Sequence, residues 1–151
     1  MDQQLLRYVD MLFIRYPILA KIRKNIIDAY ILMEKTFEDD GKLLIAGNGG
    51  SAADSEHIAG ELMKQFKIPR PISLDYVDKL KAVDPERGSF LAKKLECSLM
   101  TIPLVAHEAL ITAYSNDVDG DCVFAQQLFG YGRPGDVFLG ISTSGNSKNI
   151  I

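Results

Sequence analysis

The chain has few cysteines, no excess of positive charge and no long apolar run, and each shortage excludes a class of protein. Only Cys97 and Cys122 are cysteines; they lack CxxC spacing and no secretory or transit pattern opens the chain, which predicts a reducing, cytoplasmic compartment. A formal net charge of −3 with scattered basic residues gives no support for a nucleic-acid partner. No apolar run approaches the roughly 20 residues of a membrane span, so we expect no membrane partner. The sequence therefore favours a small-molecule ligand.

What the sequence does contain is material for one globular domain, residues 1–151. Hydrophobic residues make up 47% and charged residues 25% of the chain, as in a protein with an apolar core. Residues 2–15 and 18–37 carry apolar side chains at helical spacing, separated at Pro17. This helical pair, within residues 1–38, precedes an α/β core over residues 42–151. Its apolar content exceeds the need of one sheet face, so the helices either pack on each other or meet another subunit.

Residues 42–66, KLLIAGNGGSAADSEHIAGELMKQF, combine a strand, a glycine-rich turn and a helix. Leu43–Ala46 is a continuous apolar run, as a strand buried on both faces needs, and the turn follows at Gly47–Gly50. Ser51 stands where the N-cap of a helix is expected. Because glycines lack Cβ atoms and a helix N-terminus favours negative charge, the turn predicts a phosphate site. It matches neither a Walker A loop nor the dinucleotide fingerprint, so we expect no nucleotide cofactor.

His57 and Glu61 follow on the same predicted helix at i and i+4. This spacing puts both side chains on one helix face, and we expect that face to lie near the turn, so that phosphate and proton-transfer groups are neighbours. Two simpler interpretations remain open. In the first, the turn only connects a strand to a helix, as in many α/β proteins that bind nothing there. In the second, His57 and Glu61 form a solvated i,i+4 contact.

Beyond this stretch, two more strands and a surface excursion are expected. Residues 74–96 are charged helical material that leaves the core. Residues 100–105 predict a strand in which Pro103 favours an edge position, and the lone His107 after it favours a structural role. The remaining predicted elements are a short helix closed by Asn116 and Asp117, a helix over residues 121–129 and a strand over residues 137–141. Alternating strands and helices indicate a parallel sheet.

The last strand leads into a second polar loop, STSGNSKNII, which precedes an expected helix. Its hydroxyl groups come from Ser142, Thr143, Ser144 and Ser147. Because ligands of parallel sheets bind outside the carboxyl ends of the strands, both loops are expected to converge on one phosphate. The alternative is that the serines only cap the helix.

Three motifs together resemble the sugar isomerase (SIS) domain family, and within it the phosphoheptose isomerases: GNGGSAADSEHIAGEL, SNDVD and GDVFLGISTSGNSKNI. Their order and approximate spacing match, and the resemblance covers residues 1–151, including the helical pair. It implies an α/β three-layer sandwich with a central parallel sheet, flavodoxin-like or Rossmann-like, and a sugar phosphate substrate. The final strands and helix of the usual domain are missing, so a chain truncated at its C-terminus is expected.

The resemblance also assigns roles to residues. Glu61 matches the family's acid/base glutamate, and His57 matches the histidine that shares a zinc ion with this glutamate in metal-bound members. The implied reaction is an aldose–ketose interconversion through an enediol, from sedoheptulose 7-phosphate to heptose 7-phosphate. A partner histidine and a glutamine, and with them the remaining zinc ligands, are expected beyond Ile151. The implied substrate-binding residues are Asn48, Gly49, Gly50, Ser51, Glu61, Asn116, Asp117, Ser142, Thr143, Ser144 and Ser147.

One competing function has the same fold: a non-catalytic phosphosugar-binding or protein-binding module, like the replication-initiator-associating members. Such modules keep the phosphate loops and lose the acid/base residues, so Glu61 favours the enzyme. The resemblance further implies a homo-oligomer, a tetramer. Gln65 departs from the family, since many members carry arginine there, and residues 72–98 are longer than the family's usual loop; both leave the identity of the sugar phosphate open.

Overall fold

The computed structural model describes residues 3–151, which divide after Lys35 into two compact units. The first unit holds α1 (Gln3–Arg15), a 3-10 helix η1 (Pro17–Ile22) and most of α2 (Arg23–Glu38). Pro17 therefore separates two helical segments, as its fixed φ predicts. Arg23 holds the start of α2 on α1, since its Nη2 donates to Asp10 Oδ1 at 2.8 Å and its guanidinium carbon lies 4.6 Å from the Phe13 ring centroid.

This helical unit leaves large apolar side chains on its surface. Ile14 in α1 and Ile18 in η1 are 78% and 77% exposed. Exposed neighbours in sequence are Leu6, Met11, Ile22, Ile31 and Leu32. An apolar surface of this kind costs free energy in water, which favours a partner surface that covers it.

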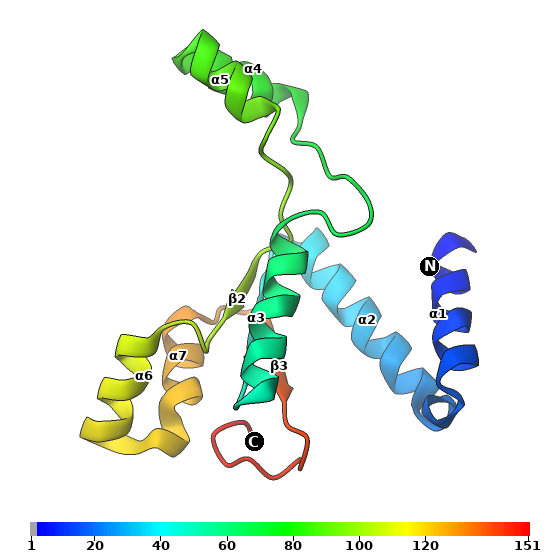
Figure 1. Ribbon diagram of the computed structural model, residues 1–151, viewed down its shortest axis with the longest axis vertical. Coiled ribbons are helices and arrows are strands. Elements are labelled where there is room, and N and C mark those ends of the chain that lie inside the picture. The colour runs from blue at the N-terminus through cyan, green and yellow to red at the C-terminus, as the bar shows by residue number, and fades with distance from the viewer. Residues whose placement is uncertain (1–2) are drawn as a thin grey trace. The chain divides into compact units, whose positions relative to one another are not determined.

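The second unit is built on a sheet of three parallel strands, as predicted. These are β1 (Leu43–Gly47), β2 (Thr101–Pro103) and β3 (Val137–Ile141), in the order β2-β1-β3 (Figure 1). All five residues of the central strand β1 are buried, which explains its continuous apolar run. β2 is short and lies at the edge, where the missing amide of Pro103 is tolerated.

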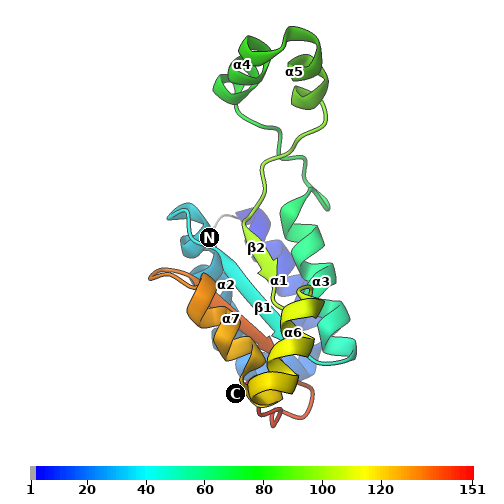
Figure 2. The same cartoon turned by 90° about the vertical axis from the view of Figure 1, so that its left-hand side faces the viewer.

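Helices cover both faces of this sheet. Leu44 and Ala46 point into the core cluster with Leu104, Val123 and Phe124, beneath α6 (Glu108–Tyr114) and α7 (Val123–Tyr131) (Figure 2). Residues alternate across a strand, so Gly47 faces the other way, where α3 (Gly50–Met63) packs. The three layers predicted from the sequence are confirmed.

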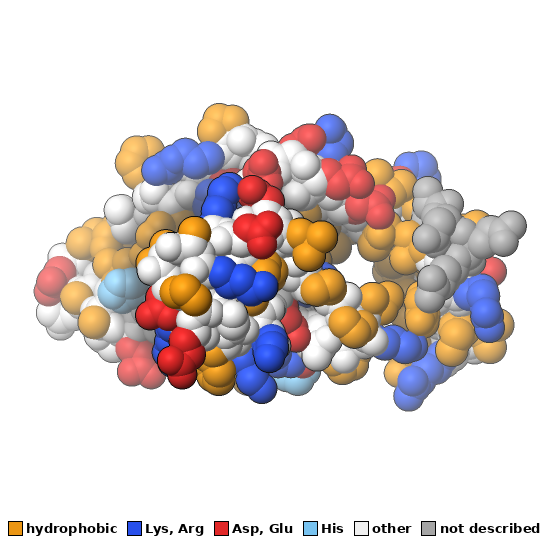
Figure 3. Space-filling view, turned by 90° about the horizontal axis from the view of Figure 1, so that it is seen from above, with side chains coloured by type: hydrophobic (Ala, Val, Ile, Leu, Met, Phe, Trp, Pro, Cys, Tyr) orange, Lys and Arg blue, Asp and Glu red, His pale blue; other side chains and the backbone are white. Residues whose placement is uncertain are grey.

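The charged excursion forms two short helices, α4 (Leu74–Val83) and α5 (Pro85–Ala92), that pack on each other. Asp84 ends the first and caps the second, accepting a hydrogen bond from the Arg87 amide at 2.7 Å. Figure 2 shows the pair standing clear of the sheet, and Figure 3 looks onto its surface, where acidic, basic and apolar side chains are mixed. The prediction of a surface excursion is confirmed.

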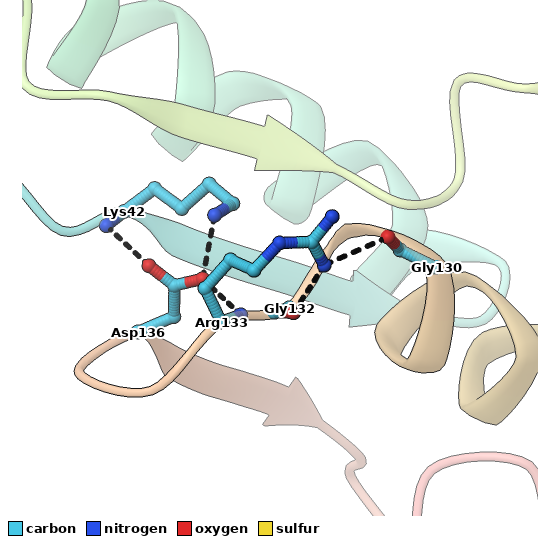
Figure 4. A network of polar contacts seen from close by, with 5 residues as sticks. All are labelled: Lys42, Gly130, Gly132, Arg133 and Asp136. Carbon is cyan, nitrogen blue, oxygen red and sulfur yellow. Dashed lines mark hydrogen bonds and ion pairs between the residues drawn. The ribbon is translucent and has the colours of Figure 1, made fainter.

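A part-buried ion pair joins the amino ends of two strands (Figure 4). Lys42, just before β1, donates from Nζ to Asp136 Oδ2 at 2.5 Å and from its amide to Asp136 Oδ1 at 3.0 Å. The Arg133 amide donates to Asp136 Oδ2 at 2.7 Å. The carboxylate, 8% exposed, therefore receives three hydrogen bonds and fixes β3 beside β1, at the end of the sheet opposite the loops that follow these strands.

Two boundaries differ from the sequence-based expectations, and one expectation stays a prediction. α3 ends at Met63 rather than near Phe66, because carbonyls of its last turn accept hydrogen bonds from Arg70 Nη2 and Ser98 Oγ. Residues 142–151 form turns, and the Ile151 amide donates to the Ser147 carbonyl at 3.1 Å, the spacing of an α-helical bond, so the helix expected there stays a prediction. Residues 115–119 form a π-helix, η2 (Ser115–Asp119), so the helix after His107 is not closed at Asn116. Among residues 3–151 no helix is both long and apolar enough to cross a bilayer.

Candidate functional site

The glycine-rich turn, residues 47–50, joins β1 to α3 in a conformation that needs glycine. An added Cβ at Gly47 would lie 2.5 Å from the Ser51 carbonyl oxygen, so strand and helix approach too closely for any side chain. Gly49 has φ 55° and is the N-cap of α3. The prediction that Ser51 is the N-cap is therefore wrong. Ser51 is buried in the first turn of the helix, and its carbonyl accepts a hydrogen bond from Ser55 Oγ.

Open space lies over the last two glycines of this turn. An added Cβ at Gly49 or at Gly50 would meet nothing within 4 Å. The amides of Ser51 and Ala52 bond back to the Asn48 and Gly49 carbonyls at 3.0 and 3.1 Å, which fixes the turn. A helix N-terminus carries partial positive charge, so this space is suited to an anionic group.

The serine loop, residues 142–149, follows β3 and gathers hydroxyl groups. Ser142 Oγ lies 3.0 Å from Ser147 Oγ and 3.5 Å from Ser144 Oγ. The left-handed Gly145, with φ 65°, reverses the chain between them. Thr143 is exposed beside this cluster. The four predicted hydroxyl residues therefore lie in one loop.

The two loops meet, as predicted from the strand order. Gly47 is the register partner of Ile141, so the loops leave adjacent parallel strands at the same level. Their side chains then join across 101 positions of sequence: Asn48 Nδ2 donates to Asn149 Oδ1 at 2.8 Å, and Asn149 Nδ2 donates to Asn48 Oδ1 at 3.0 Å. Asn149 was missed by the sequence analysis, because spacing along the chain carries no sign of a partner so distant.

His57 and Glu61 lie on α3, one turn apart, but not beside the glycine-rich turn. At 1.5 Å per residue, Glu61 is about 17 Å along the helix axis from Gly50. His57 is exposed. Glu61 is half-buried: Oε1 lies 3.5 Å from Lys64 Nζ, while Oε2 is buried without a hydrogen-bond partner among the described residues. The expected adjacency of the phosphate and proton-transfer groups therefore stays a prediction, and the two groups are separated by up to about three turns of α3.

Asn116 and Asp117 lie in η2, between α6 and α7, and are exposed. Asn116 Nδ2 donates to Asp117 Oδ1 at 2.8 Å. Figure 2 shows this connection at the same end of the sheet as the C-terminal loop. Lys148 Nζ lies 3.7 Å from Asp121 Oδ2, which ties the serine loop to the 3-10 helix η3 (Gly120–Cys122). Among the residues that the structure describes, the hydrogen bond of the Asn116 side chain goes to its neighbour Asp117 and not to either loop.

His107 and the grouping of the potential ligands bear on a metal or acid/base role. His107 is the N-cap of α6, and its Nδ1 accepts a hydrogen bond from the Leu110 amide at 3.2 Å, which confirms the structural role expected for it. Within residues 3–151, no group of three or more His, Cys, Asp or Glu side chains is placed to hold a metal ion. His57 and Glu61 supply only two donors on one helix face.

The chain is similar to proteins named phosphoheptose isomerase, although no protein-family model matches it. It is 33% identical over 136 residues to the phosphoheptose isomerase of Akkermansia muciniphila, covering 90% of this chain and 58% of the relative. It is 34% identical over 148 residues to phosphoheptose isomerase 2 of Campylobacter jejuni, covering 95% and 60%. The solved phosphoheptose isomerase of Neisseria gonorrhoeae superposes with a TM-score of 0.60 at 30% identity, covering 97% of this chain and 65% of that one.

The chain thus spans about half to two thirds of the length of these relatives. Within that span, the alignments cover 95% of this chain for the Campylobacter relative and 97% for the solved structure. Sequence and fold agree on the same group of proteins. The chain belongs to the phosphoheptose isomerase family.

Proposed function

We propose that this chain carries the phosphate-binding loops and the acid/base glutamate of an isomerase that converts sedoheptulose 7-phosphate into an aldose heptose 7-phosphate. One observation carries the proposal: the glycine-rich turn and the serine loop leave adjacent parallel strands at one level and are joined through Asn48 and Asn149. The names of the relatives supply the substrate class.

The phosphate group binds at the serine loop. Hydroxyl groups within 3.0 to 3.5 Å of one another can each donate to a phosphate oxygen, and charge-assisted hydrogen bonds of this kind are stronger than neutral ones. The open space over Gly49 and Gly50 admits the substrate close to the backbone. Asn116 and Asp117 contribute from the opposite side of the same sheet end. The proposed phosphate ligands are Ser142, Thr143, Ser144 and Ser147, with Asn48, Gly49, Gly50 and Ser51 on the sugar side.

Glu61 acts as the acid/base at the other end of the sugar. In a heptulose 7-phosphate the reacting carbons, C1 and C2, are remote from the phosphate on C7, so a base displaced along α3 fits this substrate. Helical side chains also lean toward the helix N-terminus, which brings the Glu61 carboxylate back toward the turn. The carboxylate removes a proton from C1, the C2 carbonyl becomes an enediol hydroxyl, and return of the proton to C2 gives the aldose.

This reaction also needs a group that protonates O2 and takes the proton from O1. The resemblance assigns that role to a histidine outside residues 1–151. His57 and Glu61 are two donors, whereas a secure zinc site has three or four protein ligands. His57 is proposed to orient the sugar beside Glu61 or to share a metal whose other ligands come from elsewhere.

We also propose that the protein is a homo-oligomer, a tetramer, assembled through the helical unit. The support is the exposed apolar surface of α1 and η1, with Ile14 and Ile18 nearly four-fifths exposed. Closed symmetric oligomers are the usual way in which such self-complementary apolar surfaces are covered.

The test is a coupled assay of the purified protein with sedoheptulose 7-phosphate and other ketose phosphates. Turnover of the heptulose phosphate in preference to shorter ketose phosphates is expected. Calorimetry then compares a sugar phosphate with the same sugar lacking phosphate, since the serine loop recognises the phosphate group. Equal affinities remove the phosphate assignment. Tight phosphosugar binding with no turnover of any substrate indicates a non-catalytic binding module instead.

A further inference from the structure

The amide pair of Asn48 and Asn149 is the side-chain contact that joins the two proposed substrate loops. Each amide both donates and accepts, at 2.8 and 3.0 Å. A reciprocal pair of this kind has one good geometry, because both side-chain planes must align for the two hydrogen bonds to form together. It therefore fixes the orientation of both side chains as well as the separation of the loops.

Both partners are held by their own backbones. Asn48 lies between Gly47, which is packed against Ser51, and the left-handed Gly49. On the other side, the Ser147 carbonyl accepts hydrogen bonds from the amides of residues 150 and 151, at 2.9 and 3.1 Å. This turn presents Asn149 directly beyond the serine whose hydroxyl meets Ser142. A change at Asn149 is therefore transmitted to the phosphate hydroxyls on one side and to the glycine-rich turn on the other.

The position of the pair argues against a general role in folding. Asn48 is exposed and Asn149 is half-buried, so water competes for the same hydrogen bonds. Exposed side-chain pairs contribute little to the free energy of unfolding. Their effect is local, since a contact between two loops lowers the number of arrangements that the loops sample before a ligand binds.

We propose that Asn149 is a positioning residue: it holds Asn48 and the glycine-rich turn in register with the serine loop, so that phosphate and sugar are bound by one preorganised site. This inference deepens the proposed function and rests on it for the identity of the ligand. Asn149 does not itself contact the reacting carbons. Without it, each loop keeps its own fold, and the ligand must order the two loops relative to each other.

The experiment is a double-mutant cycle with Asn149→Ala, Asn48→Ala and the double variant. Binding of sedoheptulose 7-phosphate and of inorganic phosphate is measured by calorimetry, and melting temperature is measured alongside. Loss of two hydrogen bonds predicts that Asn149→Ala weakens sugar phosphate binding about tenfold. In the Asn48→Ala background the same change is expected to have little further effect, because its partner is already gone. The melting temperature stays near that of the wild type.

Asn146→Ala is the matched control in the same loop. The Asn146 side-chain amide donates to the Ser144 carbonyl at 3.0 Å, a contact within the loop. Any loss of affinity caused by Asn146→Ala should therefore be the same in the wild type and in the Asn48→Ala background. The positioning role is overturned if the loss of affinity caused by Asn149→Ala multiplies with that of Asn48→Ala in the double variant. It is also overturned if the loss of affinity accompanies a fall in melting temperature. The two proposals can fail separately. If Asn48 and Asn149 are coupled but the protein binds the sugar phosphate without turning it over, the positioning role stands and the proposed catalysis does not. If the protein turns the sugar phosphate over but the two asparagines are not coupled, the proposed catalysis stands and the positioning role does not.

Discussion

Glu61 holds one carboxylate oxygen in a buried position without a hydrogen-bond partner among the described residues. An unsatisfied buried acceptor is costly to a fold, so such groups call for an explanation beyond stability. If the carboxylate is the base, Glu61→Gln keeps its size and removes its proton-accepting ability. We expect turnover to fall at least about 100-fold while phosphosugar affinity changes little.

Glu56→Gln is the control for this change, because Glu56 is an exposed carboxylate on the same helix. It is expected to leave both turnover and affinity near wild-type values. Steady-state kinetics and calorimetry on the two variants separate the roles. Near wild-type turnover in Glu61→Gln contradicts the proposed mechanism, whether or not the protein contains a metal.

Asp136 offers a pH-dependent prediction that concerns stability alone. Burial on its own raises the pKa of this carboxyl, but hydrogen bonds from the Lys42 ammonium and from the amides of Lys42 and Arg133 outweigh it, so the pKa lies below the ordinary value of 3.8. The folded protein therefore binds this proton more weakly than the unfolded chain does. The stabilisation is present above the unfolded pKa and is lost as pH falls through the folded pKa.

Asp136→Asn leaves the Lys42 ammonium, on a side chain that is only 15% exposed, without its counter-ion. We expect the free energy of unfolding to fall by about 3 kcal/mol at pH 7, and the difference from the wild type to shrink in acid below about pH 4. Urea unfolding at the two pH values measures this. Asp75→Asn serves as the control, since its ion pair with Lys79 is largely exposed and should contribute no more than about 0.5 kcal/mol. A pH-independent loss in Asp136→Asn is incompatible with this account.

At the scale of single residues, the sequence placed the four hydroxyl residues in one loop after the last strand, where three of the oxygens gather; their role as phosphate ligands stays a prediction. It could not identify Asn149, whose partner lies 101 positions away. It misplaced the N-cap at Ser51, because the close approach of Gly47 to α3 depends on packing between a strand and a helix that spacing does not show.

At the scale of elements, the α4–α5 pair depends on one glycine. An added Cβ at Gly88 would lie 2.3 Å from the Leu80 carbonyl oxygen, so the two helices approach through a backbone contact that no other residue allows. Gly88→Ala is expected to push the helices apart, since overpacking typically costs about 1 to 3 kcal/mol. Hydrogen exchange over residues 74–92 should quicken while the amides of β1 stay protected.

Gly130→Ala provides the contrast. Gly130 lies in α7, and an added Cβ there meets nothing within 4 Å. Alanine is the better helix former by roughly 1 kcal/mol, so this variant should be at least as stable as the wild type. Equal exchange rates in both variants would mean that the contact between α4 and α5 does not hold them together.

The elements themselves were largely predictable, for physical reasons that differ between them. β1 was found because a strand covered on both faces must be continuously apolar, and β2 was placed at the edge because proline lacks an amide. The end of α3 was missed because it is set by tertiary capping from Arg70 and Ser98. The helix expected after Ser147 stays a prediction: the Ile151 amide donates to the Ser147 carbonyl at 3.1 Å, the i,i+4 bond of a first helical turn.

At the scale of the whole molecule, the helical unit exposes apolar side chains to solvent, which is unfavourable in an isolated chain and favourable in an assembly that covers them. Scattered apolar residues are ordinary on protein surfaces, but Ile14 and Ile18 lie close in sequence and are almost fully accessible. If they form the subunit contact, a charge placed on them must be buried without a partner when subunits associate, which strongly disfavours assembly.

Ile14→Glu combined with Ile18→Glu is therefore expected to reduce the particle size measured by light scattering, with the far-ultraviolet circular dichroism of the wild type retained. Leu74→Glu is the matched control: Leu74 is an equally exposed apolar residue, at 82%, but it lies in α4, which is no part of the helical unit. It should leave the particle size unchanged. A double variant that keeps the wild-type size would show that the helical unit does not hold the assembly, because two buried carboxylates cannot be accommodated in an apolar contact without opening it.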